Sequence, residues 1–151
     1  SDFIYVIKMK LGIITFLVLI YGSFLYGQMS LTIEIDEFRN PKEGNILIAI
    51  FTDQLNFKND ISLKNWTVPK EKLIKGVFKE TVKLPLGEYG IAILDDEDIN
   101  GKMSYNFFGI PKEGYGFSDF NHSGFKKPMF SDFKFSVSDS THIIRIKLRY
   151  L

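Results

Sequence analysis

Oxygen-bearing side chains recur at alternate positions along residues 96–101, as they do in loops that bind cations. Asp96, Asp98 and Asn100 stand at the first, third and fifth positions of this segment, and Gly101 follows at the sixth, where a calcium loop makes its sharp turn. Calcium is a hard cation that takes its ligands from oxygen atoms. The spacing therefore predicts a calcium-organised loop.

The residues that follow add oxygen ligands without completing an EF-hand. Lys102 offers its backbone carbonyl at the seventh position, and Ser104 offers its hydroxyl at the ninth, directly or through water. The twelfth position is Phe107 instead of the bidentate glutamate that closes an EF-hand loop, so that class of site is excluded. Three other residues are candidates to complete the oxygen shell: Asp95, Asn106 and Glu113.

The same residue types also build a turn that needs no metal. Aspartate and asparagine side chains accept hydrogen bonds from nearby backbone N–H groups, and glycine adopts positive φ at low cost. The sequence leaves a calcium loop and a metal-free turn both open. Calcium is the only cofactor that we expect.

A glycine-punctuated aromatic segment follows the acidic one, with Gly109, Gly114 and Gly116 spaced through it. Seven rings lie in or near it: Tyr105, Phe107, Phe108, Tyr115, Phe117, Phe120 and Phe125. Binding sites combine apolar walls with a few polar groups, so these rings are candidates to line a groove for a sugar or an apolar ligand. We select four as ligand-binding candidates: Tyr105, Phe108, Tyr115 and Phe117. Alternatively, the rings pin the loop onto the core.

Catalytic chemistry has weaker support. His122 lies between Asp119 and Ser123, so it is a candidate base with an orienting carboxylate in a small hydrolase. His142, the only other histidine, falls in an alternating strand pattern that indicates a structural role. No nucleophile elbow or phosphate loop accompanies either histidine. We therefore assign no catalytic residue.

The N-terminal residues differ in kind from the rest. Met9 and Lys10 precede the apolar run 11–20, and the small residue Gly27 ends the segment, as in a secretory signal. The run is shorter than the roughly 20 residues that a spanning helix needs, so we expect no permanent membrane span. Residues 1–27 are thus predicted to be a signal peptide, with 1–8 as an upstream extension. The mature protein is predicted to be periplasmic or extracellular.

Residues 28–151 have the length of one domain, given that the chain is 45% hydrophobic and 15% aromatic. Without the predicted signal segment, which holds Lys8, Lys10 and Asp2, 17 basic and 17 acidic residues remain of the 19 and 18 in the chain. A formally neutral chain lacks the basic surface of a nucleic-acid binder. The absence of cysteine excludes disulfides, thiolate metal sites and acylation on cysteine.

Alternation with a period of two dominates residues 28–151 and predicts strands. The predicted strands are residues 30–36, 45–51, 76–84, 88–94, 132–137 and 141–148. Residues 54–75 are less regular and are predicted to cross between sheets with one helical turn. Residues 95–129 contain no predicted strand and form a long functional loop. The pattern predicts an all-β fold, an antiparallel β-sandwich of about seven strands.

Four motifs resemble a family of secreted bacterial proteins, domain of unknown function 2141: residues 85–92, 96–101, 109–118 and 128–130. The resemblance covers the chain from Leu31 to the C-terminus. It implies an exported sandwich similar to transthyretin-like and carboxypeptidase-regulatory-like domains, with no characterised activity. The family usually has histidine where this chain has Asp95, and an acidic residue where it has Ser104.

We therefore expect an exported β-sandwich that acts as a binding or structural module. Its active surface is predicted to be the loop from Asp95 to Ser118. Its partner is predicted to be a protein, a glycan or a small apolar ligand. The alternative is a small hydrolase or transthyretin-like enzyme that uses His122 and nearby acidic residues.

Overall fold

The computed structural model describes residues 27–138 and 142–151. The predicted signal segment lies outside the described residues, except for Gly27. Within the described part, no helix has the length and apolar character needed to cross a membrane.

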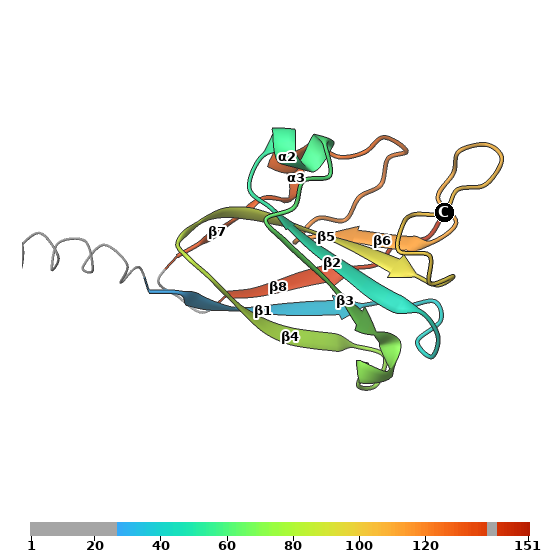
Figure 1. Ribbon diagram of the computed structural model, residues 1–151, viewed down its shortest axis with the longest axis horizontal. Coiled ribbons are helices and arrows are strands. Elements are labelled where there is room, and N and C mark those ends of the chain that lie inside the picture. The colour runs from blue at the N-terminus through green and yellow to red at the C-terminus, as the bar shows by residue number, and fades with distance from the viewer. Residues whose placement is uncertain (1–26, 139–141) are drawn as a thin grey trace, which may run out of the picture.

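Two β-sheets pack face to face (Figure 1). In the smaller sheet, β1 (Met29–Asp36) is the central strand. It pairs antiparallel with β4 (Phe78–Leu84) and parallel with β8 (His142–Lys147). The parallel pair departs from the predicted antiparallel arrangement, because the last strand returns to the edge of the first in the same direction.

The larger sheet has five strands, and all of its pairs are antiparallel. Its four-strand path runs through β3 (Lys64–Pro69), β2 (Asn45–Phe51), β5 (Gly87–Asp96) and β6 (Gly114–Phe117). The short β7 (Phe135–Val137) pairs with the first three residues of β5. A 3-10 helix, η1 (Lys70–Lys72), follows β3.

The main core lies between the two sheets, since alternate residues of each strand point inward. Its fully buried members come from the central strands: Leu31, Ile33 and Ile35 of β1, Ile46 and Ile50 of β2, and Ile91 of β5. These branched aliphatic side chains suit a pleated, two-sided core. The alternation that predicted the strands is therefore the same feature that builds the core.

A second, aromatic cluster covers one end of the outer face of the larger sheet. Two short helices, α2 (Gln54–Lys58) and α3 (Phe130–Phe133), lie over this end (Figure 1). The cluster is formed by five buried rings: Phe51, Phe57, Phe117, Phe130 and Phe133. The rings of Phe57 and Phe133 meet edge to face with centroids 4.8 Å apart. The rest of the outer face is left without this cover.

The all-β prediction is confirmed, but the strand assignment is wrong in places. The structure describes eight strands where the sequence predicts about seven. Residues 54–75 contain β3 in addition to the predicted helical turn. Residues 95–129 contain β6, where no strand is predicted. Residues 132–137 are divided between the end of α3 and β7, because Phe130 and Phe133 turn helically to bury both rings.

The close approach of α3 to β5 depends on Gly90. A Cβ atom at this position would lie 2.5 Å from Cε2 of Phe133 and 2.9 Å from Cε2 of Phe130. Both rings are packed in the aromatic cluster and cannot move aside freely. We expect Gly90→Ala to lower the free energy of unfolding by about 1–3 kcal/mol through overpacking, as measured by urea denaturation. Gly124→Ala is the control, since its nearest contact would be 3.7 Å. Equal effects of the two substitutions would contradict this packing argument.

Candidate functional site

The acidic loop, residues 97–113, leaves the larger sheet where β5 ends at Asp96. The two carboxylate oxygens of Asp96 accept hydrogen bonds from the backbone of the loop ahead of it. Oδ1 accepts from N–H of Asn100 at 3.0 Å, and Oδ2 accepts from N–H of Gly101 at 2.9 Å. Gly101 has φ of 76°, a conformation that glycine adopts at low cost. Asp96 thus folds the loop back over the end of its own strand.

Asp98 organises the exposed side of the same turn. Its Oδ2 accepts hydrogen bonds from the Ser104 hydroxyl at 2.7 Å and from the Asn100 side-chain amide at 2.9 Å. The bond from Ser104 is the largest cause of a lowered pKa for the Asp98 carboxyl. Asn100 Oδ1 in turn accepts from N–H of Lys102 at 2.8 Å. The bond from Ser104 therefore stabilises the ionised form of Asp98.

Glu113, which comes just before β6, closes the loop from the far end. Its carboxylate is buried and accepts three backbone N–H groups, from Glu97 at 3.0 Å, Asp98 at 3.3 Å and Ser104 at 2.9 Å. Hydrogen bonds to an ionised acceptor are stronger than those between neutral groups. One side chain therefore joins the start, the middle and the end of a loop of irregular backbone.

Three carboxylates converge in this arrangement. Oxygen atoms of Asp96, Asp98 and Glu113 all lie within 4.8 Å of one another. Carboxylate oxygens that accept one N–H retain a second lone pair, and an all-oxygen set is the one that a hard cation takes. Ile99, a β-branched residue between Asp98 and Asn100 in the chain, has φ of 58°. The conformation is sparsely populated for such a residue, so the surrounding contacts must impose it.

The six predicted metal ligands thus lie in the acidic loop or, for Asp96, at the end of the strand before it, whereas the further candidate Asp95 pairs with Lys70. Asp96, Asp98 and Glu113 supply the converging carboxylates, and the Ser104 hydroxyl and Asn100 side chain bond to Asp98. Lys102, whose backbone carbonyl is the predicted ligand, lies on the wall of the groove described below. The same contacts satisfy the metal-free alternative, since backbone N–H groups already bond to all three carboxylates.

A buried ion pair lies directly below this loop. Asp95 and Lys70 are both almost fully buried, with Lys70 Nζ 2.5 Å from Asp95 Oδ1. The hydroxyl of Tyr150 donates to Asp95 Oδ2 at 2.6 Å, and Lys70 also donates to the carbonyl of Asn40 at 2.7 Å. Burial raises the pKa of Asp95, while the bonds from Lys70 and Tyr150 oppose this rise. Burial and the neighbouring Asp95 carboxylate together raise the pKa of Tyr150.

Arg39 ties this ion pair to the acidic loop. Its backbone N–H donates to the Tyr150 hydroxyl at 2.9 Å, and its guanidinium stacks over the Tyr150 ring at 4.6 Å. The same guanidinium pairs with Glu97 and donates to the carbonyl of Lys112 at 3.1 Å. Sequence reasoning missed Lys70, Arg39 and Tyr150, because they lie far from the loop in the chain. A lysine directly after a strand is not a recognisable signal.

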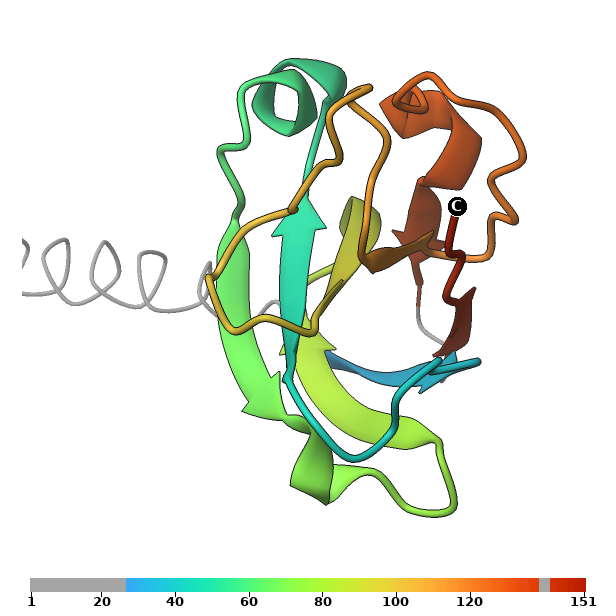
Figure 2. The ribbon, with the colours of Figure 1, turned by 90° about the vertical axis from the view of Figure 1, so that its right-hand side faces the viewer.

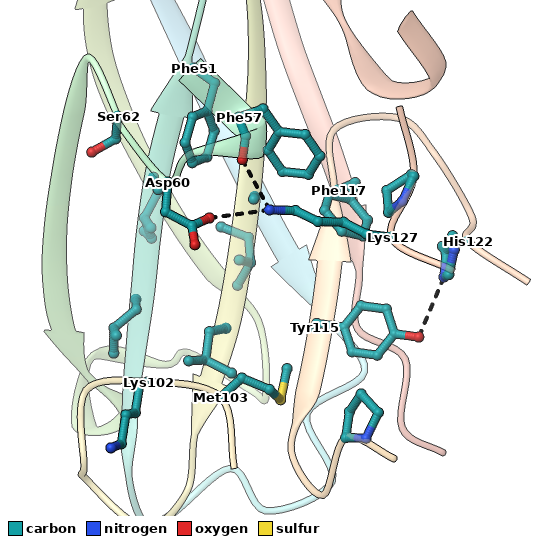
Figure 3. Close-up of a pocket in the computed structure, with 18 of the residues that line it drawn as sticks. Phe51, Phe57, Asp60, Ser62, Lys102, Met103, Tyr115, Phe117, His122 and Lys127 are labelled. Carbon is teal, nitrogen blue, oxygen red and sulfur yellow. Dashed lines mark hydrogen bonds and ion pairs between the residues drawn. The ribbon is translucent and has the colours of Figure 1, made fainter. Parts of the chain in front are cut away.

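An open groove of about 740 Å³ lies beside the acidic loop, on the outer face of the larger sheet (Figure 3). Figure 2 shows the backbone of the acidic loop passing in front of β2. Its floor is formed by the outward-facing aliphatic residues of the two central strands: Leu47, Ala49, Ala92 and Leu94. Tyr115 and Phe117 of β6 form one side, and Met103 of the acidic loop lies at one end (Figure 3). The groove is therefore an apolar trough that runs along the two central strands.

Lys127 closes the other end of the groove. Its side chain reaches across to α2, where Nζ donates to the carbonyl of Phe57 at 2.9 Å and pairs with Asp60 at 3.2 Å (Figure 3). The ammonium also lies 4.2 Å from the centroid of the Phe57 ring. This end carries a charged pair, whereas the floor carries none. A ligand in the groove would meet apolar surface below and polar groups at its ends.

The predicted aromatic ligand-binding residues separate into two groups. Tyr105, Tyr115 and Phe117 line the groove. Phe108 does not line it and is 82% exposed at the tip of the acidic loop. Its place near the other rings in the sequence does not bring it to the same surface.

His122, the candidate base of the alternative hydrolase, has structural contacts at both ring nitrogens. Arg149 can only donate, so Nδ1 accepts from its guanidinium at 3.2 Å, and Nε2–H donates to the carbonyl of Lys126 at 2.8 Å. The carboxylate of Asp119 instead accepts from the backbone N–H of Arg145 at 3.0 Å. Within residues 27–138 and 142–151, no carboxylate bonds to His122.

These features define an all-β protein of two packed sheets, with a carboxylate-rich loop at one end and an apolar groove beside it. Residues 33–145 match the family described as "Uncharacterized protein conserved in bacteria (DUF2141)", and the chain belongs to this family. The family predicted from the four motifs is thus confirmed. No curated protein and no solved structure matches the chain.

The buried pair predicts strong coupling between Asp95 and Lys70. Lys70→Met alone leaves a buried carboxylate without its cation, and Asp95→Asn alone leaves a buried ammonium. Each should cost about 3–5 kcal/mol of unfolding free energy. The double variant should cost less than the sum of the two, by about 1–3 kcal/mol, in a double-mutant cycle measured by urea denaturation. The exposed pair of Lys134 and Glu88 is the control, with coupling below about 1 kcal/mol. Additive effects at the buried pair would contradict the argument.

Proposed function

We propose that this protein is an exported binding module that takes a small apolar ligand in the groove on the outer face of its larger sheet. The observation that carries the proposal is the groove itself. Its volume of about 740 Å³ falls within the roughly 300–1,000 Å³ of small-molecule sites. The two sheets already have a complete core, so folding does not require this second apolar surface to be open.

The chemistry of the floor supports an apolar ligand over a glycan. Leu47, Ala49, Ala92 and Leu94 offer no hydrogen-bonding side chain, so sugar hydroxyls placed there would lose water without gaining partners. Polar side chains stand at the rim, where Asp60, Ser62, Asn65 and Lys102 lie. A mostly apolar molecule with one polar group at an end matches this distribution.

The groove is tested with the uncharged fluorescent probe N-phenyl-1-naphthylamine. Saturable binding with a rise in emission is expected, because the probe enters an apolar site. Ala49→Trp places a large ring on the groove floor and should weaken binding by about tenfold or more. Fluorescence titration gives the dissociation constant.

The control is Thr81→Trp, which adds the same ring to an exposed position on β4 in the other sheet. This variant should bind the probe as the unaltered protein does. A lack of saturable binding, or equal weakening by both substitutions, would overturn the proposed site.

The acidic loop supports a second proposal, that one calcium ion is held by Asp96, Asp98 and Glu113. The closeness of the three carboxylates and their all-oxygen chemistry favour it. Bound calcium would neutralise part of their mutual repulsion and hold the loop at the end of the groove. The ion would act structurally here.

Calcium is expected to raise the thermal unfolding temperature by a few degrees relative to chelator, because it binds only the folded loop. Asp96→Ala should remove this shift, although it also removes two hydrogen bonds and lowers the starting stability. Asp60→Ala, at an exposed carboxylate outside the loop, should keep the shift. An equal shift with calcium in Asp96→Ala, or none in the unaltered protein, would refute the site.

The hydrolase that uses His122 ranks behind the binding module. The contacts of His122 with Arg149 and Lys126 hold the surrounding loop in place, and both ring nitrogens are engaged in them. This role favours a structural histidine over a general base. A transthyretin-like or carboxypeptidase-regulatory-like sandwich remains our proposal for the fold type, supported by the two packed sheets and the resemblance. Export to the periplasm or medium remains our proposal for localisation.

A further inference from the structure

The tip of the acidic loop presents two adjacent phenylalanines to solvent. Phe107 is 96% exposed and Phe108 is 82% exposed, and their rings meet edge to face with centroids 5.5 Å apart. Figure 1 shows this loop projecting from the body of the protein, between the labels of β6 and the right-hand edge. Such exposure of a large apolar pair is uncommon on a soluble surface and indicates an interaction site.

The tip is a built hairpin. Lys112 N–H donates to Ser104 O, and Asn106 N–H donates to Ile110 O, both at 2.9 Å. Gly109 N–H donates back to Asn106 O at 3.0 Å, so Phe107 and Phe108 occupy the two central positions of a β-turn. The side chain of Asn106 also accepts from N–H of Phe108 and Ile110.

Neither Phe107 nor Phe108 has positive φ, so the turn tolerates both residues without requiring them. Turn positions favour glycine, proline, asparagine, aspartate and serine for their backbone properties. Neither ring joins the main core or the aromatic cluster. Two large rings exposed without a packing gain point to function.

The charges around the tip favour a lipid surface. From Ser104 to Pro111 the hairpin carries no charged side chain, and Lys102 and Lys112 stand at its base. Both lysines are exposed, and neither forms an ion pair within the described residues. Among the nearby acids, Glu113 is buried, Glu97 pairs with Arg39, and the exposed Asp98 accepts hydrogen bonds from Ser104 and Asn100.

The dimensions match as well. Lys112 follows Phe108 by four residues, which is at most roughly 13 Å, because the chain turns at Gly109. Interfacial apolar groups penetrate roughly 5–10 Å into the boundary between headgroups and acyl chains. With the two rings at that depth, the ammonium groups lie near the level of the lipid phosphates.

We propose that the hairpin tip inserts Phe107 and Phe108 into the interface of an anionic lipid bilayer, with Lys102 and Lys112 facing the phosphates. A convex tip that ends in two rings suits penetration of a fluid surface. Neither ring lines the groove, although Lys102 does, so the two phenylalanines can be changed without altering the groove.

The test places the only tryptophan at the tip. The variant Trp66→Phe/Phe107→Trp is purified in the form that accumulates in the cells that produce it. Its tryptophan emission is recorded while vesicles of equal parts phosphatidylcholine and phosphatidylglycerol are added. A shift to shorter wavelength and quenching by brominated lipid are expected, because the indole enters the interface. Both signals come from the indole at position 107. Attachment of the protein to the vesicle through its N-terminal segment would not produce them. Emission unchanged at saturating lipid would overturn the proposal.

A second pair of variants measures the contribution of the tip. Phe107→Ser/Phe108→Ser should lower partitioning into these vesicles by roughly tenfold to a hundredfold, since two rings lose their apolar transfer. Its thermal unfolding should be unchanged, because both side chains are exposed. Phe125→Ser, at an 84% exposed ring on another loop, should partition normally. Equal losses of partitioning in the two variants would refute insertion into lipid. So would an emission shift at the tip that appears when protein is added but not when lipid is added.

Neither serine substitution at the tip should change binding of N-phenyl-1-naphthylamine in the groove. Failure of the lipid test therefore leaves the groove intact as a site, and failure of the groove test leaves the tip intact.

Discussion

The buried contact between Asp95 and Lys70 is the constraint on which this end of the molecule depends. A charge taken out of water must keep its partner, so the distance between the end of β5 and the start of η1 is fixed. Tyr150 and Arg39 extend this constraint to the C-terminal residues and to the connection between β1 and β2. The acidic loop begins one residue after Asp95. Its position relative to the groove is therefore set by a contact beneath it, while Glu113 determines its internal shape.

The larger sheet uses its two faces differently. The inner face belongs to the core between the sheets, and the outer face is divided between an aromatic cluster and an open trough. The division follows residue size along the strands. Phe51 and Phe117 reach up to meet the rings of α2 and α3, whereas Ala49 and Ala92 leave space above the sheet. Small side chains at the centres of the two middle strands thus account for the groove.

Sequence reasoning succeeded where a repeated pattern carried the information. The alternation in β1 and β2 predicted both strands and their buried residues, because a half-buried strand needs that pattern. It missed β6, whose four residues include two glycines and depend on pairing with β5 for their structure. The spacing of Asp96, Asp98 and Asn100 predicted a built loop. No local pattern could indicate that Lys70 would meet Asp95, or that Phe108 would turn away from the groove.

The pairing of β1 with β8 has a consequence for the order of events in the cell. Of the strands that the structure describes, β1 is synthesised first and β8 last, yet the smaller sheet is complete only when the two lie side by side. Long-range pairing of this kind delays folding until the whole chain is present. A chain emerging from the ribosome would therefore keep its first strand without one partner throughout synthesis. If the protein is exported as proposed, such a delay would keep the chain unfolded until it had crossed the membrane.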